Sequence, residues 1–546
     1  MDAEYLAERE RLIAEDRRFR VDALALGQAT DAERKADEIV RKLRAQENET
    51  VWGPNAPPIP GSLHLFPGMG FLTARETIVN TKLYNILSKM PKGGVLHAHL
   101  DAMVDARLLL DLALKYPAYH VRADVSLTKE TISTTLPEFY PLSENEWTTA
   151  TSLTGEVYAP GSWVPLSNAR ETFDPTLGGP EGFDKWVIGA LTINPTEAYH
   201  THNTTDKASW FIWEKFQSTF GVARASLGLV RYFPLWTEYI RQFFLSSVQD
   251  GISYVEPRIP FFSGYMLSAD GEENVPHREW LIAYDRVVNE VKVELAKQGR
   301  ADEFVGSKII YSALRNCTPD ELEWYLEDCI ALKQEFPHLI CGFDLVGHED
   351  GLKPLTYYMG PLKKFVERQK ELGLDIPFIF HAGETLGDGT EADMNLYDAI
   401  LLGTKRIGHG FSLVKHPKIM EICRERQIAV EVCPISNEIL RYAGTMPMHP
   451  LPILMNQGIH IALSSDDPAI FGNMGLSFDF FQVLVSSEVT GLVTLREMAR
   501  DSIKYSCLDP DERTRALSLY DQRWLTFVDW VINTFGEGPT AHAHRN

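Results

Sequence analysis

Short apolar runs alternate with amphipathic stretches along most of the chain. Eight of these runs combine β-branched residues with polar residues at their carboxyl ends, which is typical of buried strands. They span 93–101, 252–259, 308–315, 340–350, 377–384, 406–412, 428–436 and 459–468. Between the later runs, stretches such as 319–336 place apolar residues at helical spacing. We therefore predict an α/β fold, a (β/α)8 TIM barrel, in which the strand ends would carry the functional residues.

Two regions depart from this alternation. Residues 4–47 alternate charged and apolar positions at helical spacing, and the proline-rich segment 53–61 then ends the helical pattern. We predict that residues 1–75 form an N-terminal helical extension and linker, with a possible role in dimerisation, and that residues 76–546 form the barrel. The segment at about 107–200 is rich in Ser, Thr, Gly and Pro. Because it makes the first connection too long for one crossover, it predicts an inserted lobe after the first strand.

The composition is that of a globular protein with an acidic surface. Hydrophobic residues make up 44% and charged residues 23% of the chain, and the formal net charge is −22. This charge argues against nucleic acid or an anionic membrane as the main partner, but it leaves a small neutral substrate open. No apolar run is long enough for a transmembrane helix, and the charged N-terminus has no secretory signal, so the chain as written is expected to be cytoplasmic. Secretion is the alternative if a signal has been removed.

The six cysteines lack the CxxC spacing of metal or redox sites. Cys341 and Cys433 lie in or beside apolar runs, which favours buried free thiols over disulfides.

The stretch "GGVLHAHLDA" carries the first candidate for chemistry. His97 and His99 are two residues apart at the end of a predicted strand, so their imidazoles would share one face and could bind one metal ion. The same three letters recur in the tail as His542 and His544, where no strand surrounds them. We interpret that second copy as a solvated terminus.

Further candidate ligands follow later strands. "FIFHAGE" places His381 at the end of the fifth strand, and "ALSSDDP" places Asp466 and Asp467 at the end of the eighth. Three imidazoles and one carboxylate, with an open position for water, suit a catalytic Zn²⁺ site. Glu384 and His409 are then candidates for proton transfer.

Six motifs in order resemble those of the adenosine deaminases. They are "MPKGGVLHAHLDA", "GFDLVGHEDG", "FHAGET", "RIGHGFSL", "EVCPISNEIL" and "LSSDDPAIFG", within residues 75–525. The chain is most similar to the adenosine deaminase-related growth factor subgroup, in which a charged N-terminal arm serves dimerisation. The resemblance implies hydrolysis of adenosine to inosine and ammonia, with one Zn²⁺ per chain held by His97, His99, His381 and Asp466. A homodimer is implied as well.

The resemblance also implies roles for the remaining site residues. Glu384 would protonate purine N1, and His409 would orient and deprotonate the attacking water, so that both count as catalytic together with Asp466. The residues that match substrate contacts are Asp467 toward N7, the Gly347 N–H toward N3, Trp213 as an aromatic wall, and Asp101 toward the ribose 5′-hydroxyl.

Several alternatives remain open at this point. Asp101 would repel a 5′-phosphate, which favours a purine nucleoside as the small-molecule substrate over AMP or N6-substituted adenine nucleotides. Many growth-factor-type members carry an acidic residue where this chain has Leu100. A dinuclear amidohydrolase would need a bridging lysine that "ICGFDLVGHED" does not contain. A binding or signalling protein that has lost catalysis would have a damaged site position, and all of these positions are intact.

Overall fold

A ring of parallel strands forms the centre of the fold in the computed structural model. The structure describes residues 3–53, 64–155, 158–199, 205–224, 229–261 and 264–536. In ring order the strands are β1 (Gly93–Val95), β5 (Ile252–Val255) with β6 (Arg258–Pro260), β9 (Gly306–Ser307) with β10 (Ile309–Leu314), β11 (Ile340–Val346), β12 (Phe380–Ala382), β13 (Arg406–His409), β14 (Ala429–Val432) and β15 (Ile461–Leu463). Bridges from Ala98 to Asp466 and from His99 to Arg258 close the ring. The predicted (β/α)8 barrel is therefore confirmed.

The strands are shorter than the apolar runs that predicted them. β1 ends at Val95 and β15 ends at Leu463, so His97, His99 and Asp466 all lie just beyond regular strand geometry. The backbone of Asp466 has a φ of 60°, which takes it out of the extended region and ends the strand. These strand-end loops still join across the barrel, because His99 N donates to Asp466 O and Asp466 N donates to His97 O, both at 3.2 Å.

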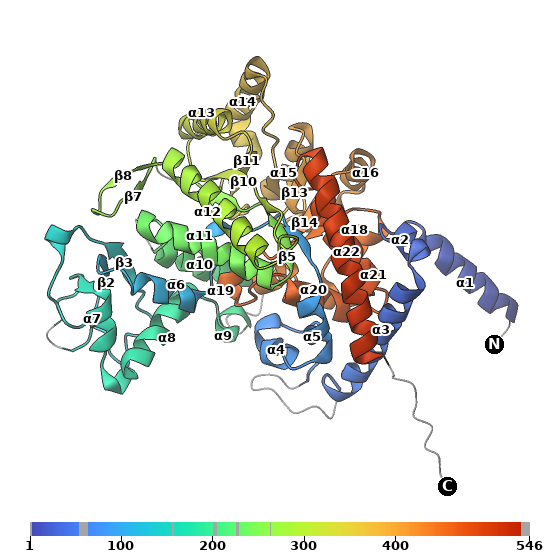
Figure 1. Cartoon of the computed structure of the whole chain (residues 1–546), viewed down its shortest axis with the longest axis horizontal. Helices are drawn as coiled ribbons and strands as arrows, with labels where there is room; N and C mark the ends of the chain where they lie inside the picture. Colours follow the sequence, from blue (N-terminus) through green and yellow to red (C-terminus); the bar gives the residue numbers. More distant parts are fainter. Residues whose placement is uncertain are drawn as a thin grey trace, which may run out of the picture.

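Helices surround the strands (Figure 1). The predicted helical stretch 319–336 forms α13 (Pro319–Glu335), which begins with a capping box at Thr318 and a proline in its first turn. The other helices of the barrel part are α11 (Phe233–Gln249), α12 (His277–Lys297), α14 (Met359–Leu372), α15 (Glu391–Leu401), α16 (Pro417–Arg426), α17 (Pro434–Ile439), α18 (Leu451–Asn456), α19 (Pro468–Phe471), α20 (Ser477–Val485), α21 (Leu492–Lys504) and α22 (Pro510–Phe535).

The long first connection contains a small antiparallel sheet. Its strands β2 (Tyr119–Arg122), β3 (Glu138–Pro141) and β4 (Val164–Pro165) pair in the order β3-β2-β4. Helices α6 (Ala106–Ala113), α7 (Leu166–Glu171), α8 (Gly179–Leu191) and α9 (Pro195–Tyr199) lie in the same region, and α10 (Thr205–Arg224) follows. In Figure 1 the sheet with α7 and α8 stands at the left edge, on one side of the barrel.

The N-terminal region lies on the opposite side in the same view (Figure 1). It consists of α1 (Ala3–Arg17), α2 (Ala23–Gln28) and α3 (Asp31–Thr50), followed by α4 (Phe71–Ile78) and α5 (Lys82–Lys89). α3 packs on α22, where Trp524 Nε1 donates to Glu33 Oε1 at 2.8 Å. α1 has no buried residue and points away from the body.

Three further sequence predictions concern the cysteines, the linker with the tail, and membrane-spanning helices. All six cysteines are free thiols, as predicted. Most of the proline-rich linker (54–63) and the tail histidines His542 and His544 lie outside the described residues. Over the parts of the chain that the structure describes, no helix combines the length and apolar character needed to cross a bilayer.

Candidate metal centre and active site

Four predicted ligands meet at the mouth of the barrel. The donor atoms of His97, His99, His381 and Asp466 all lie within 4.8 Å of one another. The Nε2 atoms of His97 and His99 are each 3.3 Å from Asp466 Oδ1. His97 Nε2 and Asp466 Oδ1 are buried without a hydrogen-bond partner, as expected of donors arranged around a cation. The structure therefore fits a metal ion bound by three imidazoles and one carboxylate.

The close approach of these rings depends on a glycine. Gly408 in β13 pairs with His381 in β12 and lies against the ring of His97. A Cβ atom at Gly408 would stand 2.9 Å from His97 Cε1. Because that contact is shorter than van der Waals distance, only glycine lets His97 take this position.

Two carboxylates hold the imidazoles in place. Asp344 Oδ2 lies 2.6 Å from His381 Nδ1, and Glu431 Oε2 lies 2.8 Å from His97 Nδ1. Each pairing leaves the Nε2 atom of the imidazole for a metal ion. Neither carboxylate was singled out from the sequence, although a charged residue inside an apolar strand, as in "GFDLV" and "AVEV", is the signal that could have found it.

Buried arginines tie these carboxylates together. Arg258 Nε lies 2.6 Å from Asp344 and its Nη2 lies 2.8 Å from Glu431. Arg406 pairs with Glu431 at 2.5 Å and with Glu256 at 2.7 Å. All five side chains are fully buried, so the network compensates each charge inside the barrel and keeps the imidazoles in fixed orientations.

The protonation states suit metal binding. Burial lowers the pKa of His381 to about 3 and also lowers the pKa of His99, so both imidazoles are neutral and keep a lone pair at neutral pH. Burial opposes ionisation of Asp466, but the neighbouring His409, His97 and His99 outweigh it and hold its pKa well below the usual range. The set therefore offers neutral nitrogen donors and one anionic oxygen.

Glu384 and His409 lie beside the ligands. Glu384 Oε1 is 3.5 Å from His409 Nδ1, and His409 Nε2 is 3.8 Å from Asp466 Oδ2. Burial, with the charges of Asp466 and Glu349, raises the pKa of Glu384 well above its ordinary value. Burial lowers the pKa of His409 well below its own. Burial thus favours the neutral form of both groups, an acid that can donate a proton beside a base that can accept one.

Backbone strain marks two of these residues. His409 has a φ of 58° and Asp466 has a φ of 60°. Both values lie in the left-handed region, which residues other than glycine rarely adopt. Asn437 Nδ2 lies 3.2 Å from His409 Nδ1, and Ser436 Oγ donates to Asp466 Oδ2 at 2.8 Å. Both partners come from α17, which therefore holds the base and the carboxylate ligand in position.

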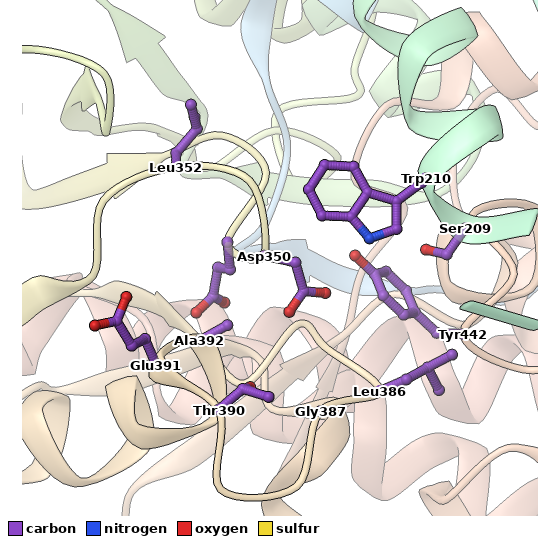
Figure 2. Close-up of a pocket in the computed structure, with 11 residues that line it drawn as sticks. Ser209, Trp210, Asp350, Leu352, Leu386, Gly387, Thr390, Glu391, Ala392 and Tyr442 are labelled. Atoms are coloured by element: carbon purple, nitrogen blue, oxygen red, sulfur yellow. The ribbon is translucent and has the colours of Figure 1, made fainter. Parts of the chain in front are cut away.

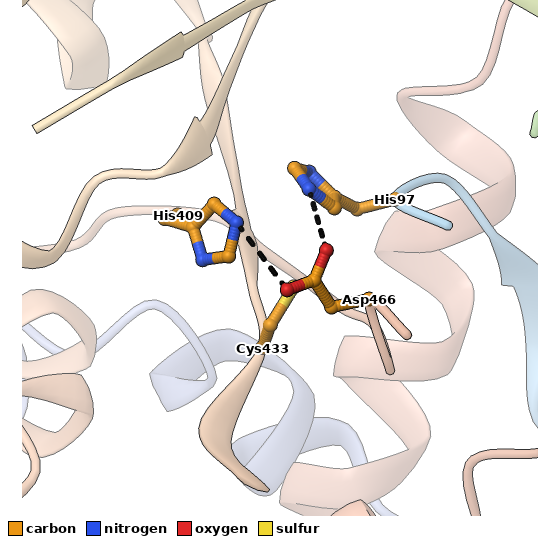
Figure 3. A group of neighbouring side chains, drawn as sticks. All are labelled: His97, His409, Cys433 and Asp466. Carbon is orange, nitrogen blue, oxygen red and sulfur yellow. Dashed lines mark ion pairs between the residues drawn. The ribbon is translucent and has the colours of Figure 1, made fainter. Parts of the chain in front are cut away.

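A second group of possible donors overlaps the first. Figure 3 shows His409, Cys433 and His97 around Asp466, and the donor atoms of these four also lie within 4.8 Å of one another. Burial, followed by the charge of Asp466, raises the pKa of the Cys433 thiol well above its ordinary value. A protonated thiol is a poor metal ligand, so the three-histidine set is the better site.

A cavity of about 300 Å³ opens onto the metal ligands, and we call it the catalytic pocket. His99, His381, Glu384, Asp466 and Asp467 line its inner end, and Trp213, Phe216 and Phe220 from α10 form an apolar wall. Gly347, with a φ of 111°, also lines it. Trp213 stacks on His348 with ring centroids 4.4 Å apart and donates from Nε1 to the Tyr442 hydroxyl at 2.8 Å.

One predicted substrate contact is not tested by the pocket lining. Asp101 lies in the short helix η1 (Leu100–Ala102) directly after His99 and is 9% exposed. It is not among the residues that line the catalytic pocket. Its contact with a ribose hydroxyl stays a prediction.

Comparison with known proteins points to one family. The model of the family described as adenosine deaminase matches residues 194–523. Adenosine deaminase 2-A of Danio rerio is 33% identical over 466 residues, which cover 85% of this chain and 84% of that protein. Adenosine deaminase 2 of Homo sapiens is 31% identical over 467 residues, with 85% and 83% covered.

Solved structures share the fold at low sequence identity. The apo N6-methyl-AMP deaminase of Arabidopsis thaliana superposes with a TM-score of 0.52 at 14% identity, over 80% of this chain and 98% of that chain. An amidohydrolase of Burkholderia ambifaria with bound Zn superposes with a TM-score of 0.50 at 14% identity, over 83% and 95%.

Proposed function

The chain belongs to the adenosine deaminase family, and on this premise we propose that it is a zinc-dependent hydrolase that converts adenosine, and 2′-deoxyadenosine, into the corresponding inosine nucleoside and ammonia. The observation that carries the proposal is the position of Glu384 and His409, 3.5 Å apart, beside the cluster of His97, His99, His381 and Asp466.

The metal would be Zn²⁺, held by His97, His99, His381 and Asp466. Three imidazole nitrogens and one carboxylate match the ligand preference of zinc in hydrolytic sites. When bound, the ion lowers the pKa of water and so supplies a nucleophile at neutral pH. The buried carboxylates Asp344 and Glu431 keep the imidazoles oriented for it.

The residues of the chain itself move the protons and orient the purine. Glu384 gives a proton to purine N1, which makes C6 more electrophilic. His409 takes the proton from the attacking water, since its imidazole is neutral and lies within 4 Å of Asp466. Asp467, as a protonated carboxyl, donates a hydrogen bond to purine N7, which is an acceptor, and the Gly347 N–H donates to N3. Trp213, Phe216 and Phe220 cover the apolar face of the nucleoside.

A nucleoside suits the catalytic pocket better than a nucleotide. Of the described residues that line it, none is Lys or Arg. A phosphate group would therefore find no basic side chain as a partner there. AMP and N6-substituted adenine nucleotides are therefore disfavoured, and a catalytically weak binding or signalling protein is disfavoured because each catalytic position is present.

We place the subunit contact of a homodimer at the N-terminal extension. α1 has no buried residue and exposes Tyr5, Leu6 and Leu12, which a second copy would cover. Truncation of residues 1–28 should convert the dimer to a monomer in sedimentation velocity; an unchanged oligomeric state would refute this placement. The cytoplasmic location stays a prediction.

The test of the proposed function is a substrate panel. The ultraviolet absorbance change that accompanies loss of the C6 amino group is followed on adenosine, 2′-deoxyadenosine, AMP, N6-methyl-AMP and adenine, with and without a zinc chelator. We expect turnover of the two nucleosides alone, abolished by the chelator and restored by Zn²⁺. Preference for AMP would contradict the proposed nucleoside substrate. No turnover by the zinc-loaded protein would contradict the proposed deaminase activity.

A further inference from the structure

A second cavity, of about 430 Å³, lies next to the catalytic pocket (Figure 2). Three of its lining residues are carboxylates, namely Glu349, Asp350 and Glu391, and two are aromatic, Trp210 and Tyr442. We call this cavity the acidic pocket. Figure 2 shows Trp210, Tyr442 and the Asp350 carboxylate on facing sides of it.

The two pockets are lined by side chains that contact one another. Trp213 lines the catalytic pocket and donates its Nε1 hydrogen to Tyr442, which lines the acidic pocket. The ring of His348 contacts Trp213 on one side and Trp210 on the other, with centroids 4.4 and 4.8 Å apart.

The catalytic acid is also tied to the acidic pocket through its backbone. Glu384 lines the catalytic pocket, and its N–H donates to Glu349 Oε1 at 2.9 Å. The carboxylate of Glu349 is otherwise engaged by Asn395 at 2.7 Å and by Arg315 at 3.5 Å. Glu349 is therefore a structural part of the wall, and other residues of the acidic pocket must accept hydrogen bonds from a ligand.

Asp350 is the carboxylate that is incompletely compensated. It is half-buried and accepts a hydrogen bond from Thr385 Oγ1 at 2.6 Å. Burial raises the pKa of Asp350 although Thr385 and the charge of Lys415 oppose the shift. The Lys415 ammonium itself is held by the carbonyl oxygens of Leu386 at 2.8 Å and Gly387 at 2.5 Å. A cation inside the pocket would supply the missing compensation.

A buried hydroxyl points into the same space. Ser209 is 5% exposed, lines the acidic pocket, and its Oγ has no hydrogen-bond partner among the described residues. In Figure 2 this oxygen is directed toward the cavity beside Tyr442. An orphaned buried hydroxyl that faces a cavity indicates a polar ligand, because leaving it unpaired costs about 1–3 kcal/mol.

These groups together match a compact cation with several N–H donors. Asp350, the Ser209 hydroxyl and the Tyr442 oxygen are acceptors, and the indole of Trp210, which is 51% exposed, offers an aromatic face. A divalent metal ion would need several converging carboxylate oxygens, and among the described residues Asp350 belongs to no group of donors close enough to hold one. We infer that the acidic pocket binds ammonium, the product cation of the reaction, on its way out of the enzyme.

The link to the product rests on the proposed function. Each turnover would release one ammonia molecule from C6, on the other side of the wall from Asp350. Ammonia becomes ammonium by taking up one proton, so the released product is a cation at neutral pH. The acidic pocket then lowers the chance that ammonium stays beside the metal ligands, whereas the purine product leaves through the aromatic mouth of the catalytic pocket.

The test measures binding in the absence of any nucleoside. Thermal unfolding of the zinc-loaded full chain is followed against rising ammonium chloride, with sodium, potassium and tetramethylammonium chloride at equal ionic strength as comparisons. Asp350→Asn keeps an acceptor for Thr385 but removes the charge. Asp375→Asn is the matched control, since it makes the same change on an exposed loop that lines neither pocket.

We expect ammonium to stabilise the wild type and Asp375→Asn in a saturable way. In Asp350→Asn the ammonium concentration that gives half of the maximal stabilisation should rise about tenfold, as for loss of one partly buried charge pair. Ser209→Ala, which removes only the orphaned hydroxyl, should give a smaller rise and serves as the second variant if Asp350→Asn does not fold.

Two results would overturn the inference. One is an equal stabilisation by sodium or potassium, and the other is an ammonium response unchanged in both pocket variants. Adenosine turnover is measured separately on the same preparations. Loss of turnover with ammonium binding retained would sink the proposed function alone, and the reverse pattern would sink the ammonium site alone.

Discussion

Glu438 makes the stability of the protein depend on pH around neutrality. Its carboxylate is fully buried on α17, where Oε2 accepts hydrogen bonds from Phe71 N and from the Tyr199 hydroxyl, each at 3.0 Å. Its Oε1 is buried without a hydrogen-bond partner. Burial outweighs these contacts and raises the pKa of Glu438 from 4.5 to about 7.

The sign of the effect follows from proton binding. Between the two pKa values the folded state holds a proton that the unfolded state has lost, so stability falls as pH rises through this window. The Glu438 contribution is fully present below the unfolded pKa and is lost above about pH 7. With a shift of about 2.5 units, the loss between pH 5 and pH 8 is about 2.5 kcal/mol.

The variant Glu438→Gln tests this reasoning, because glutamine keeps the shape and cannot ionise. Urea unfolding of both zinc-loaded proteins at pH 5, 6, 7 and 8 gives their difference in unfolding free energy. We expect the unfolding free energy of the variant, relative to that of the wild type, to rise by about 2.5 kcal/mol between pH 5 and pH 8. Glu367→Gln, on the exposed face of α14, is the control and should show a constant difference. Parallel curves for Glu438→Gln and the wild type would refute the argument.

Three further predictions concern the active site. Glu384→Gln should keep zinc, by elemental analysis, but lower kcat about 10²- to 10⁴-fold because the N1 proton donor is gone; near-normal kcat would contradict its role. Asp344→Asn should weaken zinc affinity about 10- to 100-fold in chelator competition, since His381 loses its orienting carboxylate, and an unchanged affinity would show that the contact is only structural. Gly408→Ala should displace His97 and reduce zinc content, and a crystal structure with His97 unmoved would refute the packing argument.

Local patterns in the sequence were sufficient to predict the barrel and to propose the residues that meet at the candidate metal site. The alternation of apolar runs and amphipathic stretches is set by the periodicity of strands and helices, which depends on neighbouring residues only. The i, i+2 spacing of His97 and His99 places both rings on one side of the chain for the same reason. His381 and Asp466 could be added because carboxyl ends of parallel strands meet at one face of a barrel.

The residues that support these ligands were not predictable in this way. Arg258 touches Asp344 and Glu431, which are 86 and 173 positions away along the chain. No local pattern encodes such a partnership, because it arises when the ring closes and the buried charges must find one another inside it.

The acidic pocket shows the same limit most clearly. Ser209 and Trp210 come from α10, Asp350 follows β11, and Tyr442 follows α17, so the cavity exists only where these segments pack together. The amino-acid pattern was enough to predict which residues are buried and which chemistry each strand end can offer. Distances between charges, the protonation states that follow from burial, and the cavities themselves depend on long-range packing, and for that reason they emerged only from the folded chain.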